Sequence, residues 1–171
     1  MKIEKARECE VDAMLDIRTS AILHDAGSAF SESDVEKWAV KRDPTSLRRH
    51  IQDGEVWVAR QSGDQIAGWA WRNGARVKQI YVASQCQRQG VGRRLLAFLE
   101  NQMRDEGLHQ TSANAALNAV AFYQSCGYVA GPGEQHETTQ TMRRVLAQQD
   151  ECTPSSLTLS SANDSRRSLK K

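Results

Sequence analysis

Gly90 and Gly92 stand two residues apart, with arginines on both sides, where an apolar run gives way to a helical pattern. The apolar run is residues 80–82 and the polar turn is residues 87–92. Glycine lets a backbone approach a ligand without a Cβ in the way. The first N–H groups of a helix lack an internal partner and carry the positive end of the helix dipole. The turn is therefore predicted to bind an anion, and a phosphate suits it best.

The spacing of this turn discriminates between phosphate ligands. The dinucleotide pattern G-x-G-x-x-G lacks its third glycine, and the Walker pattern lacks its Gly-Lys-Ser/Thr ending. The pattern that matches is Q/R-x-x-G-x-G/A, carried by Gln87, Gly90 and Gly92. It resembles the acyl-CoA pyrophosphate loop of the GNAT superfamily of N-acetyltransferases. Alone it is short and common, and a plain turn before a surface helix would also produce it.

A second block, residues 116–128, strengthens the resemblance. Phe122-Tyr123 and Gly127-Tyr128 fit the GNAT pattern of an aromatic pair, a few helical residues and a glycine with an aromatic residue. The segments at 31–39, 55–59 and 66–71 also look like a bacterial subgroup of GNAT acetyltransferases. The resemblance thus covers residues 1 to about 146.

The elements that must position these blocks follow from the hydrophobic pattern. Strands are expected at 1–7, 55–61, 65–72, 75–82, 108–116, from 127 and at 136–146, and helices at 10–24, from Ser31, from Val91 and at 117–125, with a short basic helical turn at 47–51. Val11, Met14, Leu15, Arg18 and Ile22 share a helical period, as do Val91, Leu95, Phe98, Leu99 and Met103. The predicted fold is α/β, in the order β-α-α-β-β-β-α-β-α-β-β around one mixed sheet. Residues 1–147 form the predicted domain, and the serine-rich residues 148–171 a disordered tail.

The resemblance implies a splayed sheet with acetyl-CoA in the gap between the strand ending at Val82 and the strand at 108–116. It implies pantetheine pairing with the backbone of Ile80, Tyr81 and Val82. It implies pyrophosphate binding by Gln87, Arg88, Gln89, Gly90, Val91, Gly92 and Arg93. Tyr123 would protonate the departing thiolate, because a phenol of pKa ~10 is close enough to a thiol of pKa ~8.5. A buried Tyr123 that only packs is the other interpretation.

Two departures from the family pattern affect the site. Ala116 stands where the family commonly has Asn, and Asn118 is a candidate cofactor contact in its place. The strand at 75–82 has no carboxylate to act as a base. Deprotonation of the amine could then use a water chain, or a base from the surrounding loops, for which the candidates are His24, Glu32 and His136. The residues predicted to line the acceptor pocket are His24, Trp38, Trp71 and His136.

The leading hypothesis is direct transfer of an acetyl group from acetyl-CoA to the primary amine of a small molecule. The alternatives are a protein acetyltransferase acting on lysine or N-terminal amines, and a non-catalytic acyl-CoA sensor. Cys126 has no acid or His at an evident spacing, so packing is favoured over a nucleophilic role.

Composition narrows the setting of this activity. The chain has 171 residues, 39% of them hydrophobic, and a net charge of +2, which gives no strong field for nucleic acid or membrane. The first residues lack a signal peptide's apolar region, and no apolar run approaches the ~20 residues that span a bilayer. The four cysteines, Cys9, Cys86, Cys126 and Cys152, are scattered, which predicts no metal site and a cytoplasmic location. A homodimer is left open.

Overall fold

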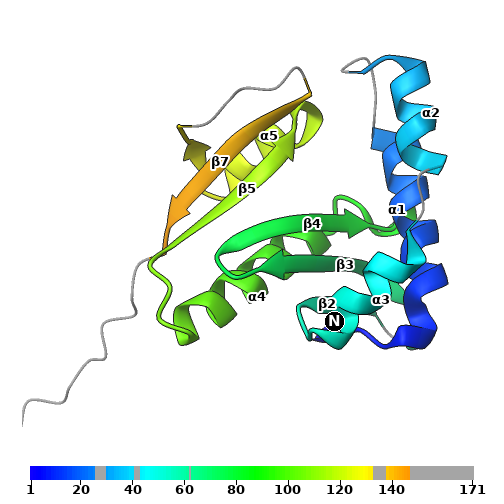
Figure 1. Cartoon of the computed structure of the whole chain (residues 1–171), viewed down its shortest axis with the longest axis horizontal. Coiled ribbons are helices and arrows are strands. Elements are labelled where there is room, and N and C mark those ends of the chain that lie inside the picture. The colour runs from blue at the N-terminus through cyan, green and yellow to red at the C-terminus, as the bar shows by residue number, and fades with distance from the viewer. Residues whose placement is uncertain (26–29, 41–42, 62, 133–137, 147–171) are drawn as a thin grey trace, which may run out of the picture.

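The computed structural model describes residues 1–25, 30–40, 43–61, 63–132 and 138–146, and its centre is a seven-stranded sheet (Figure 1). The strands are β1 (Lys2–Lys5), β2 (Val56–Arg60), β3 (Ile66–Asn73), β4 (Arg76–Val82), β5 (Gln110–Ala116), β6 (Val129–Ala130) and β7 (Thr139–Val145). Their order across the sheet is β1-β2-β3-β4-β5-β7-β6. All neighbours are antiparallel except β4 and β5, which run parallel. The prediction of an α/β fold with one mixed sheet is confirmed.

Helices cover both faces of this sheet. They are α1 (Val11–Asp25), α2 (Glu32–Val40), α3 (Pro44–Gln52), α4 (Val91–Asp105) and α5 (Val120–Ser125), with the 3-10 turns η1 (Glu8–Glu10), η3 (Ser84–Cys86) and η4 (Leu117–Ala119). The predicted order gave two helices before β2, and this was wrong, because α3 is a full helix of nine residues. Pro44 starts it, since proline is tolerated in the first turn, and the Asp43 carboxylate caps it by accepting from the Ser46 N–H at 2.9 Å.

Two hydrophobic cores lie on the two faces of the sheet. On one face Leu95, Leu99 and Met103 of α4 are fully buried against alternate residues of the central strands, so the helical period predicted there is confirmed. On the other face Met14 of α1 packs with Trp69 of β3, whose indole Nε1 donates to the Met14 carbonyl at 2.8 Å. The side chains of a strand alternate between faces, so each central strand contributes to both cores.

The sheet splits between β4 and β5. Their register contains only Arg76↔Ser112 and Val77↔Ala113, whereas β3 stays paired with β4 as far as Val82. Beyond Val77 the two parallel strands diverge, as their ribbons show in Figure 1. The splay that the family resemblance implied is therefore present, and it leaves one backbone edge of residues 80–82 unpaired with β5.

The predicted tail, residues 148–171, lies outside the described residues, so the division of the chain at 147 stays a prediction. None of the helices within the described ranges is long and apolar enough to cross a membrane.

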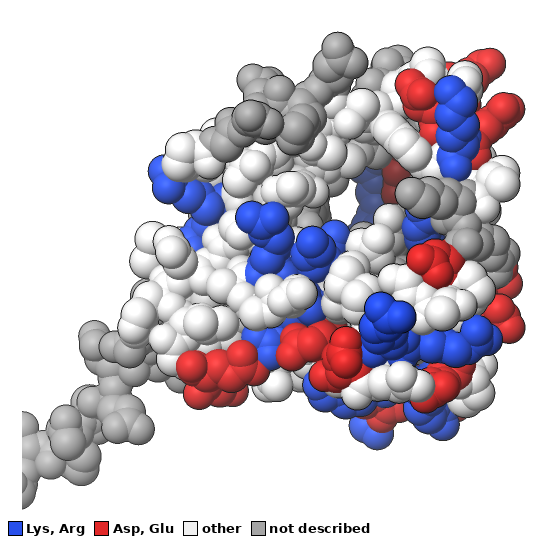
Figure 2. Space-filling view, viewed as in Figure 1, with Lys and Arg blue, Asp and Glu red and all other residues white. Residues whose placement is uncertain are grey.

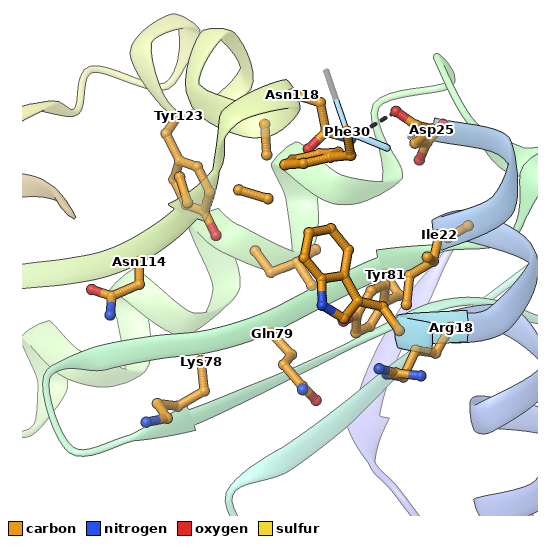
Figure 3. A pocket seen from close by; sticks show the side chains of 16 residues that line it. Arg18, Ile22, Asp25, Phe30, Lys78, Gln79, Tyr81, Asn114, Asn118 and Tyr123 are labelled. Carbon is orange, nitrogen blue, oxygen red and sulfur yellow. Dashed lines mark hydrogen bonds between the residues drawn. The ribbon is translucent and has the colours of Figure 1, made fainter. Parts of the chain in front are cut away.

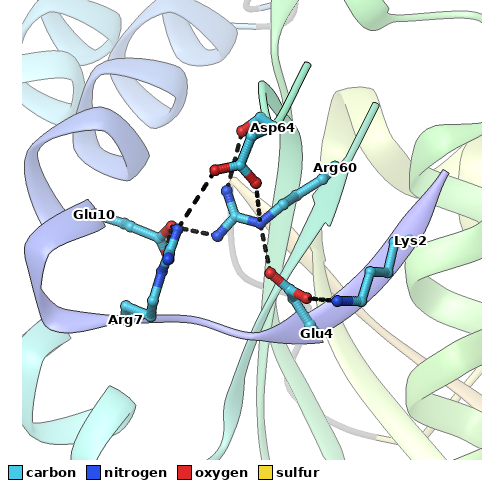
Figure 4. Close-up of polar contacts among 6 residues, drawn as sticks. All are labelled: Lys2, Glu4, Arg7, Glu10, Arg60 and Asp64. Atoms are coloured by element: carbon cyan, nitrogen blue, oxygen red, sulfur yellow. Dashed lines mark hydrogen bonds and ion pairs between the residues drawn. The ribbon is translucent and has the colours of Figure 1, made fainter. Parts of the chain in front are cut away.

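A buried arginine joins the first strand to the rest of the sheet (Figure 4). The Arg60 guanidinium of β2 lies 2.7 Å from Glu4 on β1, and it also pairs with Glu10 and with Asp64. Lys2 adds a second cation beside Glu4. Hydrogen bonds from Lys2 and then Arg60 lower the pKa of Glu4 from its ordinary value of 4.5 to about 2. The folded state thus stabilises the carboxylate form of Glu4.

We expect this network to make stability fall in acid. A carboxyl group with a lowered folded pKa stabilises the protein above its unfolded pKa, and this contribution is lost as pH falls through the folded value. Urea unfolding should therefore show a falling free energy of unfolding between about pH 4.5 and pH 2. Arg60→Gln should lower stability at pH 7, because it leaves Glu10 buried without one of its partners, and should flatten the acid limb. The exposed Arg48→Gln is the matched control, and an acid limb unchanged in Arg60→Gln would contradict the assignment.

Candidate functional site

A cavity of about 280 Å³ occupies the splay between β4 and β5 (Figure 3). Helix α1, Phe30, Trp38 in the last turn of α2 and the turn before α5 close it. Figure 2 shows the hollow from outside with basic side chains on its edge. The residues that line it are Arg18, Ala21, Ile22, Asp25, Phe30, Trp38, Lys78, Gln79, Ile80, Tyr81, Asn114, Ala115, Ala116, Asn118, Ala119 and Tyr123.

Tyr123 holds its hydroxyl at this cavity. Its ring is fixed edge-to-face between Phe122 and Tyr128, with ring centroids 5.2 Å away in both cases, and the residue is only 7% exposed. Figure 3 shows the hydroxyl directed into the cavity. No side chain or carbonyl of the described residues accepts a hydrogen bond from it. A buried tyrosine usually satisfies its hydroxyl, so this donor is available to a ligand.

Burial raises the pKa of Tyr123 well above its ordinary value of 10. A free phenol is close in pKa to a thiol, and burial widens the gap between the pKa of Tyr123 and that of a thiol. The hydroxyl is therefore protonated at every physiological pH and can donate a hydrogen bond, while complete proton transfer to a thiolate is less favourable than for a free phenol.

The turn before α4 has the backbone of an anion site. Gly90 caps the helix with φ 78° and Arg88 has φ 58°, both in the left-handed region. A Cβ added at Gly90 would meet nothing within 4 Å, so the space beside this residue is open. The first-turn N–H groups of residues 91–93 have no acceptor inside the helix. Gly92 is different, because its Cβ would touch Phe122 and Val82 at 3.5 Å.

Asp25, the last residue of α1, joins the two sides of the splay. The Gln87 amide donates to its carboxylate at 2.9 Å, and the Asn118 amide donates to its backbone carbonyl at 2.7 Å. Both amides were predicted to contact the cofactor, and here they connect the turn before α4 and the segment after β5 to α1. Asp25 thereby links the two sides at this end of the cavity.

The other predicted cofactor residues lie along the same path. Ile80 and Tyr81 line the cavity on the open edge of β4, followed by Val82. Gln89 lies in the turn, and its side-chain oxygen accepts a hydrogen bond from the Gln61 amide at 3.2 Å. Val91 is buried, and Arg93 is exposed with its guanidinium 3.3 Å from the Ser125 hydroxyl of α5.

The predicted acceptor residues are only partly brought together. Trp38 lines the cavity, and Trp71 lines a neighbouring one instead. His24 is exposed beside Asp25, at 3.0 Å, and lines neither cavity. Glu32 is exposed at the start of α2. His136 lies outside the described residues.

Several lining residues were not found by sequence reasoning. Arg18 could have been found, because it falls within the apolar period of α1, and a cation on an apolar helix face is a signal of function. Gln79 and Asn114 carried no such signal. His50 was taken for a surface residue, yet it is half-buried and stacks on Trp71 with ring centroids 3.7 Å apart. Its burial lowers its pKa from the ordinary value of 6.5, which favours the neutral imidazole.

Comparison with known proteins identifies a family whose members this chain resembles in sequence. Residues 27–143, well over half of the chain, match the acetyltransferase (GNAT) domain. Two curated proteins named probable N-acetyltransferase 14 also match, that of Bos taurus with 38% identity over 94 residues and that of Danio rerio with 30% over 97. Each match covers 49% of this chain, but 46% and 35% of those proteins, so the similarity spans less than half the length of each relative.

Solved structures share the fold at low identity. A GCN5-related N-acetyltransferase of Rhodopseudomonas palustris superposes with a TM-score of 0.78 at 20% identity, over 85% of this chain and 95% of that one. The PaiA N-acetyltransferase of Thermoplasma acidophilum, in complex with coenzyme A, gives 0.72 at 15% identity, over 84% and 98%. YncA of Salmonella typhimurium, with its cofactor acetyl-CoA, gives 0.63 at 20% identity, over 97% and 99%.

Proposed function

The chain belongs to the acetyltransferase (GNAT) domain family, and on that premise we propose that it is an acetyl-CoA-dependent N-acetyltransferase acting on the primary amine of a small molecule. The observation that carries the proposal is the unpaired edge of β4 after Val77. This edge runs from the hydroxyl of Tyr123 toward Gly90, the N-cap of α4. One extended thioester ligand could therefore contact both the hydroxyl and the start of α4.

The residues present fit acetyl-CoA in three respects. The free backbone edge at Ile80–Val82 can pair with amides as an added strand would. The open space at Gly90 and the first-turn N–H groups of α4, which lack an acceptor inside the helix, suit a pyrophosphate. The Tyr123 hydroxyl is left without a partner among the described residues, and it can donate to the sulfur. Acetyl-CoA supplies the thioester, and the protein binds it and positions the amine.

Direct transfer agrees with the residues at the cavity. No cysteine or serine is among the described residues that line it, so a covalent acetyl-enzyme has no evident nucleophile. The amine nitrogen would attack the thioester carbon, the C–S bond would break, and the thiolate would accept a hydrogen bond and then a proton from Tyr123. The amine proton would leave through water, because Asp25 is the one described carboxylate at the cavity and its oxygens already accept from Gln87 and pair with His24.

The test is acetyl-CoA-dependent release of free thiol across a panel of primary amines, with mass spectrometry of the acetylated product. Turnover of at least one small amine supports the proposal. Thermal stabilisation by coenzyme A without turnover of any amine, peptide or protein would contradict it and favour a sensor. Acetylation of peptides or proteins alone would favour the protein acetyltransferase. The scattered cysteines lead us to propose the cytoplasm as its location.

A further inference from the structure

A second cavity adjoins the splay on its far side from Tyr123. Its volume is about 370 Å³, and it lies between α1, α3 and β3. Arg18, Trp38 and Gln79 line both cavities, so these three side chains form the boundary between them. The walls of the second cavity are largely aromatic, with Trp71 stacked on His50 and with Trp69 beside them. An acceptor that enters from this side would meet the boundary residues before it reached the thioester.

Arg18 is the cation at this boundary, and no described residue supplies a counter-ion for it. The two buried arginines of the sheet, Arg60 and Arg72, both pair with carboxylates. Arg18 makes no ion pair with any described residue. Its Nη1 is buried and has no hydrogen-bond partner in the described part of the chain. Arg18 also lies against Tyr81, with the guanidinium carbon 5.9 Å from the centroid of the ring. A buried N–H donor of a charged group is rarely left unpaired unless a ligand completes it.

The nearby acidic groups are held by other partners. The Asp25 carboxylate accepts from Gln87 and pairs with His24. The Asp43 carboxylate, at the second cavity, caps α3 through the Ser46 N–H. The remaining described cation at the splay, Lys78, is exposed and lies with its nitrogen 5.7 Å from the Trp71 ring. The boundary between the cavities is thus net basic and offers planar N–H donors.

We propose that Arg18 binds a carboxylate of the acceptor, so that the acceptor is a primary amine that also carries a carboxylate, as free amino acids do. This rests on the proposed N-acetyltransferase function and narrows its substrate class. In Figure 3 Arg18 and Tyr123 lie on opposite sides of the cavity, which lets one small molecule place its carboxylate at the guanidinium and its amine toward the hydroxyl. The guanidinium fork matches a carboxylate with two parallel hydrogen bonds. The aromatic walls of the second cavity can receive an apolar side chain.

The experiment compares amines that differ only in the anionic group. Matched pairs such as phenylalanine and phenethylamine, or leucine and isopentylamine, are assayed for kcat/KM with acetyl-CoA. We expect the carboxylate-bearing member to be preferred at least about tenfold, the effect of a charge-assisted hydrogen bond. Arg18→Gln should bring that ratio near one, mainly through KM for the amino acid, and Arg18→Lys should keep part of it. The affinity for acetyl-CoA should not change in either variant.

Controls separate this proposal from a structural role and from the proposed function. Arg48→Gln, an exposed arginine of α3, should keep the wild-type ratio. Equal loss for both members of a pair in Arg18→Gln would overturn the carboxylate assignment, as would a wild-type preference for amines without a carboxylate or for phosphoethanolamine. Either result leaves the acetyltransferase function standing. If no amine is turned over, binding of phenylalanine to the CoA-loaded protein, followed by tryptophan fluorescence, still decides. Binding that Arg18→Gln abolishes supports the site, and absence of binding overturns it.

Discussion

Tyr123→Phe should lower kcat by about 10²-fold while leaving the affinity for acetyl-CoA nearly unchanged. The substitution keeps the ring between Phe122 and Tyr128 and removes only the hydroxyl that faces the cavity. Because this hydroxyl has no partner among the described residues, its loss breaks no hydrogen bond of the described protein. We therefore expect the free energy of unfolding to change by less than about 1 kcal/mol.

The measurement compares the rate of acetyl transfer in the wild type and the variant, by pre-steady-state kinetics or under conditions where chemistry is rate-limiting. The acetyl-CoA dissociation constant and urea unfolding are measured on the same samples. The raised pKa of Tyr123 adds a further check, since the wild-type rate should show no alkaline limb from this phenol near pH 10. A variant that binds acetyl-CoA and keeps the wild-type kcat would show that Tyr123 only packs. Parallel loss of stability and rate would also count against the hydrogen-bond role, because the ring contacts alone would then explain it.

The fold was predictable where local patterns decide it. The burial of Leu95, Leu99 and Met103 follows from a helical period that any amphipathic helix must show. The full length of α3 was not predicted, because the sequence pattern indicated only a short helical turn at 47–51. Pro44 starts the helix, since the first turn needs no N–H from that residue. The Asp43 cap three residues before Ser46 was the signal that the sequence offered.

Trp38 was predicted at the acceptor side, but the residues that meet it there could not be predicted, for a different reason. Arg18, Trp38 and Gln79 come from α1, α2 and β4, and their meeting depends on how the helices pack across the splay. Sequence spacing within one element says which face a residue takes, but not which residue of another element lies opposite. The pKa of Tyr123 was missed likewise, since burial by residues far apart in the chain raises it.

Gly90→Ala should weaken acetyl-CoA binding at least about tenfold, and Gly90→Val more strongly still. The residue caps α4 with φ 78°, and a Cβ there would project into open space rather than into the protein. The protein itself therefore pays only the backbone cost of a left-handed residue, about 1–2 kcal/mol. A phosphate that approaches the N–H groups of residues 91–93 would meet the added carbon instead, so affinity should fall by more than stability explains.

Gly107, at the other end of the same helix, provides the matched control. It has φ 79°, and a Cβ added to it would also meet nothing within 4 Å. Gly107→Ala should thus lose a similar free energy of unfolding in urea while its acetyl-CoA dissociation constant, measured by calorimetry, stays at the wild-type value. The difference between the two variants isolates the ligand from the strain. Equal affinities in Gly90→Ala, Gly107→Ala and the wild type would mean that the turn before α4 does not hold the pyrophosphate, and that the open space at Gly90 is solvent.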